Sequence, residues 1–106
     1  MRILICDDEV RYIQPLRKCL EQYMAEHNIP SEITEAVSPQ KVLLSREVYD
    51  IAFLDIQMEN VNGLTLAKEL RQRNRKTALF FMKDIRTMPW IFRPSVTLRN
   101  LLSRIG

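Results

Sequence analysis

Histidine, cysteine and glycine are scarce in this chain of 106 residues, which contains one, two and two of them, respectively. The single histidine, His27, argues against a histidine-based triad or zinc site. Cys6 and Cys19 lack the spacing of metal ligands, and we expect both to be reduced thiols of a small intracellular domain. No phosphate-cradling loop follows the first predicted strand, and the acidic residues there would repel a flavin phosphate, which argues against a flavin-binding protein.

Long hydrophobic runs are also absent. No stretch of roughly 18 apolar residues occurs, so we expect no membrane-spanning segment and no membrane partner. The apolar run Ile3–Cys6 near the amino terminus is too short for a secretory signal. The sequence therefore predicts a cytoplasmic protein, and its length fits one domain with a modest core.

Basic charge is concentrated at one end of the chain. The formal net charge is +3, yet residues 1–82 carry 11 Lys/Arg against 12 Asp/Glu. Residues 83–106 carry five basic side chains against a single acidic one, Asp84. This shift in composition predicts two parts, a domain over residues 1–85 and a divergent basic tail over residues 86–106.

Short apolar runs alternate with amphipathic segments over most of the chain. Uninterrupted apolar runs predict buried strands, whereas apolar residues three or four positions apart predict helices. The predicted strands are residues 2–6, 33–37, 51–54 and 77–82. The predicted helices are residues 10–26, residues 39–46 and a segment that opens at Gly63. Helices between successive strands predict an α/β fold, in which right-handed crossovers build a parallel sheet.

Details of the predicted helices depend on single residues. Pro15 is costly inside a helix, so we expect the first helix to begin near Gln14. Ser38 is expected to cap the second helix with its hydroxyl, ahead of Pro39 at the first helical position. The predicted apolar face of the third helix comprises Leu64, Ala67, Leu70 and, as a further candidate, Leu66. The residues of that helix expected to face water are Lys68, Glu69, Arg71 and Arg73.

Carboxylates directly follow two of the predicted strands. Asp7 and Asp8 follow the first strand, and Asp55 follows the third, central strand. The carboxyl ends of these parallel strands can be neighbours, which would bring the three carboxylates to the sheet edge where α/β folds bind ligands. Oxygen ligands suit Mg²⁺, and a carboxylate beside such an ion is equipped to accept a phosphoryl group. The alternatives are a cap on the first helix by Asp7, Asp8 and Glu9, and a loop cap by Asp55.

Two motifs, Ile3–Glu9 and Phe53–Met58, with Gly63 eight residues beyond Asp55, resemble the receiver domain of bacterial two-component response regulators. The sequence around Asp55 and the helix after Gly63 are similar to receivers joined to LytTR-type DNA-binding domains. The resemblance covers roughly residues 1–82 and implies a flavodoxin-like, doubly wound parallel sheet. It also implies a signalling module that is not an enzyme.

The resemblance assigns roles to the residues of the acidic edge. It implies that Asp55 accepts a phosphoryl group from a sensor histidine kinase in a phosphorelay. It implies that Asp7, Asp8 and Asp55 hold Mg²⁺ together with the backbone carbonyl of Gln57. Such receivers act on DNA only through an output domain, which we expect this chain to lack, so the chain resembles the remnant of a transcriptional regulator. Homodimer formation is an open alternative.

The sequence also departs from the receiver pattern. Glu59 stands where the family usually has proline. Lys83 occupies the switch position of the family's Thr or Ser, 28 residues after Asp55, and no Lys-Pro pair follows it. Lys83 would either pair with Asp55, partly replacing the absent lysine of the family, or point to solvent.

The tail after about residue 85 resembles nothing in the family, and the genetic code offers a reason. Met88–Ile91 must be encoded ATG-CCN-TGG-ATH, and joining the third base of each codon to the next two bases forces an Ala and an Asp there. The same frame permits Lys-Pro across residues 99–101. We therefore expect a frameshifted or truncated receiver without its fifth strand.

The alternative function is a small basic nucleic-acid-binding protein that uses the tail with Trp90 and Phe92.

Overall fold

A four-stranded parallel sheet forms the centre of the protein in a computed structural model that describes residues 1–56 and 62–81. The strands are β1 (Arg2–Cys6), β2 (Glu32–Ala36), β3 (Ile51–Leu54) and β4 (Ala78–Phe81). They lie in the order β2-β1-β3-β4, which is the order of flavodoxin-like sheets. The predicted fold class is therefore confirmed, and the predicted strand ends lie within one residue of the observed ends.

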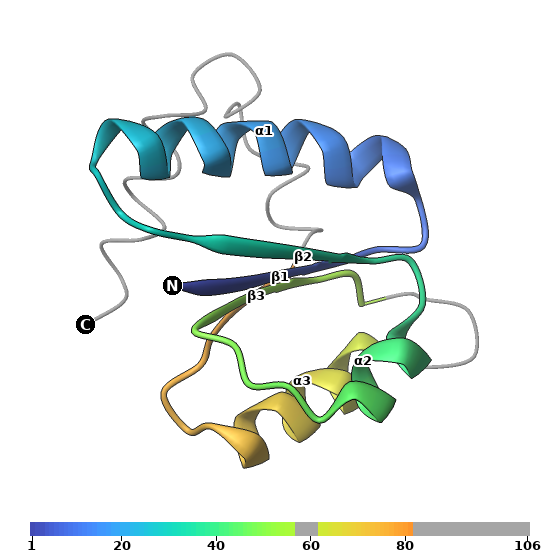
Figure 1. The fold of residues 1–106 in the computed structure, drawn as a ribbon. Coiled ribbons are helices and arrows are strands. Elements are labelled where there is room, and N and C mark those ends of the chain that lie inside the picture. Colours follow the sequence, from blue (N-terminus) through green and yellow to red (C-terminus); the bar gives the residue numbers. More distant parts are fainter. Residues whose placement is uncertain (57–61, 82–106) are drawn as a thin grey trace.

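Helices cover both faces of the sheet (Figure 1). α1 (Val10–Glu26) lies on one face, and α2 (Pro39–Ser45) and α3 (Gly63–Arg73) lie on the other. Within the described parts of the chain, no helix is both long enough and apolar enough to cross a membrane.

Alternating side chains of β1 and β3 build two hydrophobic layers, one on each face of the sheet. The layer against α1 comprises Ile3, Ile5, Ile51 and Phe53 with Ile13, Leu16, Leu20 and Met24. The layer against α2 and α3 comprises Leu4, Cys6, Ala52 and Leu54 with Val42, Leu66 and Leu70. Both central strands are thus buried on both faces, which explains why their sequences are apolar without alternation.

The register between strands places the ends of β1 and β3 side by side. Cys6 pairs with Leu54 in β3 and with Ala36 in β2. At the opposite edge, the Asp50 carboxylate accepts the Arg2 backbone N–H at 2.7 Å, and the Asp50 N–H donates to the Arg2 carbonyl at 2.8 Å. A slip of one residue would break both bonds and turn each strand side chain to the other face. The residues that follow Cys6 and Leu54 therefore meet at one edge.

The first helix has the extent that apolar spacing predicted. α1 spans Val10–Glu26 with Pro15 inside it, so the later start near Gln14 that was expected from Pro15 is wrong. Proline has no N–H to donate to the carbonyl of Arg11, one turn earlier. Arg11 and Pro15 are both exposed, so water can bind the carbonyl that the proline leaves without a helical partner. The buried apolar residues on the opposite side, such as Leu16, stabilise the helix through this turn.

At α2 the predicted start is confirmed and the predicted cap is wrong. The helix begins at Pro39, and Ser38 occupies the N-cap position with an extended backbone. The Ser38 side chain nevertheless makes no capping hydrogen bond. Because proline holds its φ angle near the helical value, Pro39 is the residue that favours a helix start here.

The buried face of α3 is rotated relative to the predicted face. Leu64 is 48% exposed, whereas Leu66 is fully buried. The rotation follows from Gly63, which is itself buried at the first helical position, because buried positions recur three, four and seven residues later. The prediction that Arg73 faces water is also wrong, since only 12% of its side chain is exposed and its guanidinium reaches the end of α2.

Candidate metal centre

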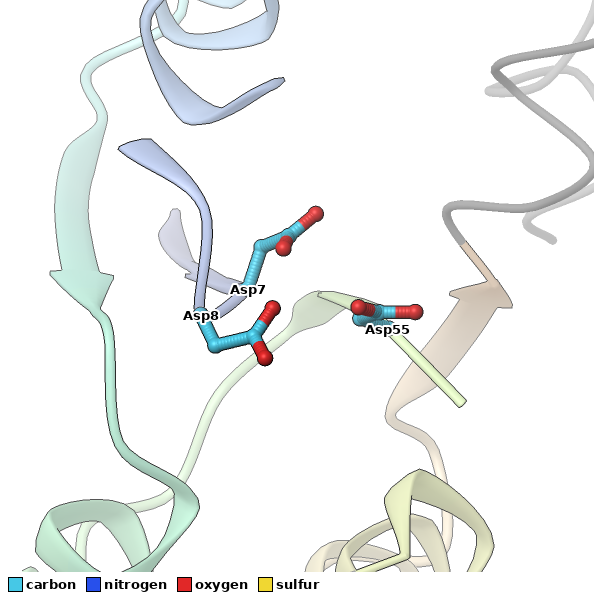
Figure 2. A group of neighbouring side chains, drawn as sticks. All are labelled: Asp7, Asp8 and Asp55. Carbon is cyan, nitrogen blue, oxygen red and sulfur yellow. The ribbon is translucent and has the colours of Figure 1, made fainter. Parts of the chain in front are cut away.

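Three carboxylates converge at the carboxyl edge of the sheet. Asp7 and Asp8 directly follow β1, and Asp55 directly follows β3. Because Cys6 and Leu54 are paired, Asp7 and Asp55 leave adjacent strands side by side. One carboxylate oxygen of each residue lies within 4.8 Å of the others. Figure 2 shows Asp7 and Asp8 on the loop after β1, with Asp55 across from them. The structure thus brings together the carboxylates that the sequence predicted to meet.

Backbone hydrogen bonds hold this arrangement. The Asp7 N–H donates to the last carbonyl of β2 at 3.0 Å, and the Asp55 N–H donates to the last carbonyl of β1 at 3.0 Å. The Asp7 carboxylate accepts the backbone N–H of Glu9 at 3.0 Å. Asp7 is fully buried and Asp55 is 7% exposed, whereas Asp8 is exposed. The cluster therefore combines two carboxylates held in the protein with one that faces solvent, from which an ion can enter.

The pKa of the Cys6 thiol is sensitive to the negative charge at this edge. Burial raises the pKa of Cys6 to about 12, and the charges of Asp7, Asp55 and Asp8 add to the effect of burial. Carboxylates within 4.8 Å of one another repel, so a cation among them stabilises the cluster. A ligand set of carboxylate oxygens that is open to water fits Mg²⁺ rather than zinc.

The alternative that the acidic run caps α1 is wrong for Glu9. Glu9 occupies the N-cap position, but its side chain makes no capping hydrogen bond. Its carboxylate instead pairs with Arg11 at 2.8 Å. The neighbouring Asp7 and Asp8 offer their oxygens to the cluster with Asp55. Within this run, Glu9 therefore forms an ion pair with Arg11, whereas Asp7 and Asp8 belong to the carboxylate cluster.

Some predicted site residues lie outside the described residues. Gln57, whose backbone carbonyl is a predicted ligand, belongs to this group, as do Glu59, Lys83 and the basic tail. The role of Gln57 as a ligand, of Lys83 at the switch position and of the tail in nucleic-acid binding stay predictions.

Two residues at the start of α3 make hydrogen bonds that were not predicted from the sequence. Asn62 caps α3, because its Oδ1 accepts the Leu64 N–H at 2.8 Å. Gly63 donates its N–H to the Ile56 carbonyl at 2.9 Å and so closes the loop after Asp55. An Asn-Gly pair directly before an amphipathic segment is the signal that could have found the cap.

Comparison with known proteins identifies the family. The chain matches the response regulator receiver domain over residues 3–88. It is 31% identical over 110 residues to accessory gene regulator protein A of Staphylococcus epidermidis, covering 88% of this chain and 46% of that protein. It is 38% identical over 72 residues to the sensory transduction protein LytR of Streptococcus agalactiae, covering 68% of this chain and 29% of that protein. The chain thus spans less than half the length of these relatives.

One solved structure of similar fold contains a metal ion. It is the response regulator protein TrrA of Thermotoga maritima in complex with Mg²⁺-BeF, with a TM-score of 0.52 and 30% identity. The match covers 74% of this chain and 64% of that chain. Together, the sheet order, the acidic edge and the family match show that this chain belongs to the response regulator receiver domains, the signalling modules of phosphorelays.

Proposed function

We propose that Asp55 is the phosphoacceptor of this receiver and that Asp7, Asp8 and Asp55 hold Mg²⁺. The observation that carries the proposal is the convergence of the three carboxylates within 4.8 Å at the carboxyl edge of the sheet. The Mg²⁺-BeF complex of TrrA supports the choice of this ion. The backbone carbonyl of Gln57 is the fourth proposed protein ligand.

The proposed transfer is a single displacement at phosphorus. An Asp55 carboxylate oxygen attacks the phosphorus of a phosphohistidine, and a P–O bond forms as the P–N bond to the imidazole breaks. The imidazole leaves with the electron pair and takes up a proton from solvent. Asp55 keeps some exposed surface and can be reached, whereas fully buried Asp7 serves as an oxygen ligand only. Bound Mg²⁺ would neutralise charge on the phosphoryl oxygens.

A sensor histidine kinase is the proposed phosphodonor, and the aspartyl phosphate is the proposed signal. The two curated relatives are named as a gene regulator and a sensory transduction protein, and each is more than twice as long as the part matched here. We therefore propose that a receiver of this kind acts on DNA only through a separate output domain. Homodimer formation of the phosphorylated receiver is part of the same proposal.

Treatment with a small phosphodonor such as acetyl phosphate tests the acceptor. In the presence of Mg²⁺, mass spectrometry should detect one hydroxylamine-labile phosphoryl adduct that is lost in Asp55→Asn. Asp8→Asn removes a metal ligand and should slow adduct formation by about ten-fold or more. Glu32→Gln, at the start of β2 on the opposite edge, is the matched control and should react like wild type. An adduct that persists in Asp55→Asn would contradict the assignment.

Lys83 is proposed to pair with Asp55 from the switch position. Its ammonium would then compete with Mg²⁺ for the same carboxylate. Lys83→Thr should therefore bind Mg²⁺ more tightly than wild type in a calorimetric titration, whereas Lys76→Thr, an exposed lysine ahead of β4, should not. Equal affinities of wild type and Lys83→Thr would show that Lys83 does not compete for the site.

A further inference from the structure

We infer that Gly63 is a positioning residue for the Asp55 site, because its missing side chain lets the start of α3 lie directly against the Asp55 peptide. The inference rests on the proposed function of Asp55. A Cβ added to Gly63 would lie 2.1 Å from the Asp55 carbonyl oxygen and 2.9 Å from both the Asp55 carbonyl carbon and the Ile56 Cα. All three are backbone atoms, so no flexible side chain can move aside.

Backbone hydrogen bonds hold both residues that flank the Asp55–Ile56 peptide bond. On one side, the Asp55 N–H is bonded to the last carbonyl of β1 at 3.0 Å. On the other, the Ile56 carbonyl accepts the Gly63 N–H at 2.9 Å. α3 cannot retreat easily, because Leu66 and Leu70 anchor it in the core with at most 1% of their surfaces exposed. A side chain at position 63 would therefore displace the Asp55 peptide.

The size of this displacement matters for metal binding. The added Cβ would lie about 1 Å inside the 3.0 Å limit that real Cβ contacts respect. The Asp55 carboxylate moves with its peptide, whereas Asp7 and Asp8 belong to a separate loop after β1. Mg²⁺ requires nearly octahedral ligands at about 2.0–2.1 Å, so a shift of this size separates Asp55 from the shared site. Gly63 thereby determines whether the three carboxylates can bind one ion.

Gly63→Ala tests the inference against two matched variants that lower stability away from the Asp55 peptide. Leu20→Ala removes buried apolar surface from α1, on the other face of the sheet, and Lys68→Gly weakens α3 itself at an exposed position. Mg²⁺ affinity is measured on folded protein by NMR titration, and stability by thermal unfolding. We expect Gly63→Ala to bind Mg²⁺ about ten-fold more weakly or worse. Both matched variants should keep the wild-type affinity at a reduced unfolding temperature, and wild-type affinity in Gly63→Ala would overturn the inference.

A second measurement uses the wild-type protein and does not depend on the folding of a variant. Coupling between the site and the Gly63 contact must be reciprocal, so Mg²⁺ should slow hydrogen exchange of the Gly63 amide. The reference is the Asn74 amide, which is bonded to Leu70 at the other end of α3. An unchanged ratio of the two exchange rates would overturn the inference. Wild-type protein that neither binds Mg²⁺ nor forms an adduct would overturn the proposed function itself, and the inference with it.

Discussion

Cys6 lies at the acidic edge of the sheet but is not one of the proposed metal ligands. It ends β1 with no exposed surface, and burial together with the nearby carboxylates raises its pKa to about 12. At pH 8 a thiol whose pKa is raised this far is almost entirely protonated, and the thiolate is the reactive form. Cys6 should therefore be inert as long as the sheet is intact.

A Cys19→Ser variant isolates Cys6 for labelling with a maleimide at pH 8. We expect the native variant to stay unlabelled for a period in which the urea-unfolded variant is labelled completely. The reciprocal Cys6→Ser variant should be labelled slowly at Cys19, which is partly buried and whose pKa is raised by that burial. Equal rates for Cys6 in native and unfolded protein would show that the strand end opens readily.

At the scale of elements, Arg73 joins α3 to the end of α2. Its Nη1 donates to the Val42 carbonyl at 3.2 Å and the Glu47 carbonyl at 3.1 Å, and its Nη2 donates to the Leu43 carbonyl at 2.8 Å. Its Nε donates to Glu69 at 3.1 Å within α3. The carbonyls in the last turn of a helix have no intrahelical donor. One guanidinium thus satisfies the end of α2 and fixes the distance between the two helices.

Replacing Arg73 with methionine keeps an unbranched apolar stem and removes the donors. We expect Arg73→Met to lower the free energy of unfolding by about 2–3 kcal/mol, because hydrogen bonds from a charged group are lost and the Leu43 carbonyl loses its side-chain donor, whereas the Val42 carbonyl keeps the Ser45 hydroxyl. Urea denaturation measures the change. Arg71→Met is the matched control two residues away, since Arg71 is exposed and should change stability by less than about 0.5 kcal/mol. A similar loss in both variants would contradict the role given to Arg73.

The same helix shows how far sequence patterns reach. Apolar spacing predicted the strands to within one residue and the start of α3 at Gly63, because these depend on local preference and burial. The inward face was misjudged at Leu64 alone, because the rotation of α3 depends on a contact between Gly63 and the Asp55 peptide. Arg73 was misjudged for a related reason, since its partners lie about 30 residues earlier in the chain.

The acidic edge was predictable because it depends on the strand topology and not on particular side-chain contacts. Asp7 and Asp55 each follow an apolar run, and parallel strands end at the same edge, so topology alone brings them together. The contact from the Gly63 N–H to the Ile56 carbonyl, by contrast, joins two backbone groups. Backbone contacts of this kind leave no signature in side-chain chemistry, and only coordinates can show them.

For the whole molecule, the division of charge between residues 1–82 and the basic segment that follows leads to a genetic prediction. We propose that residues from about Arg86 onward are encoded in a shifted frame. Sequencing the gene should show that the alternative frame continues as a receiver with a Lys-Pro pair and leads into an output domain. A protein rebuilt with the alternative residues should be more stable and less prone to associate, because a fifth strand would cover the sheet edge. An alternative frame that soon ends would contradict the proposal.

The central place of β1 in the sheet has a consequence for the protein as it is synthesised. β1 leaves the ribosome first, yet the bonds that lock it to the start of β3 join Arg2 and Asp50, which are 48 positions apart. A nascent chain therefore carries Asp7 and Asp8 for a long interval without Asp55, and β1 has only β2 as a partner during that interval. The three-carboxylate site comes into being in the same event in which β3 docks, so a chain that has not closed its central sheet cannot yet bring the three carboxylates together.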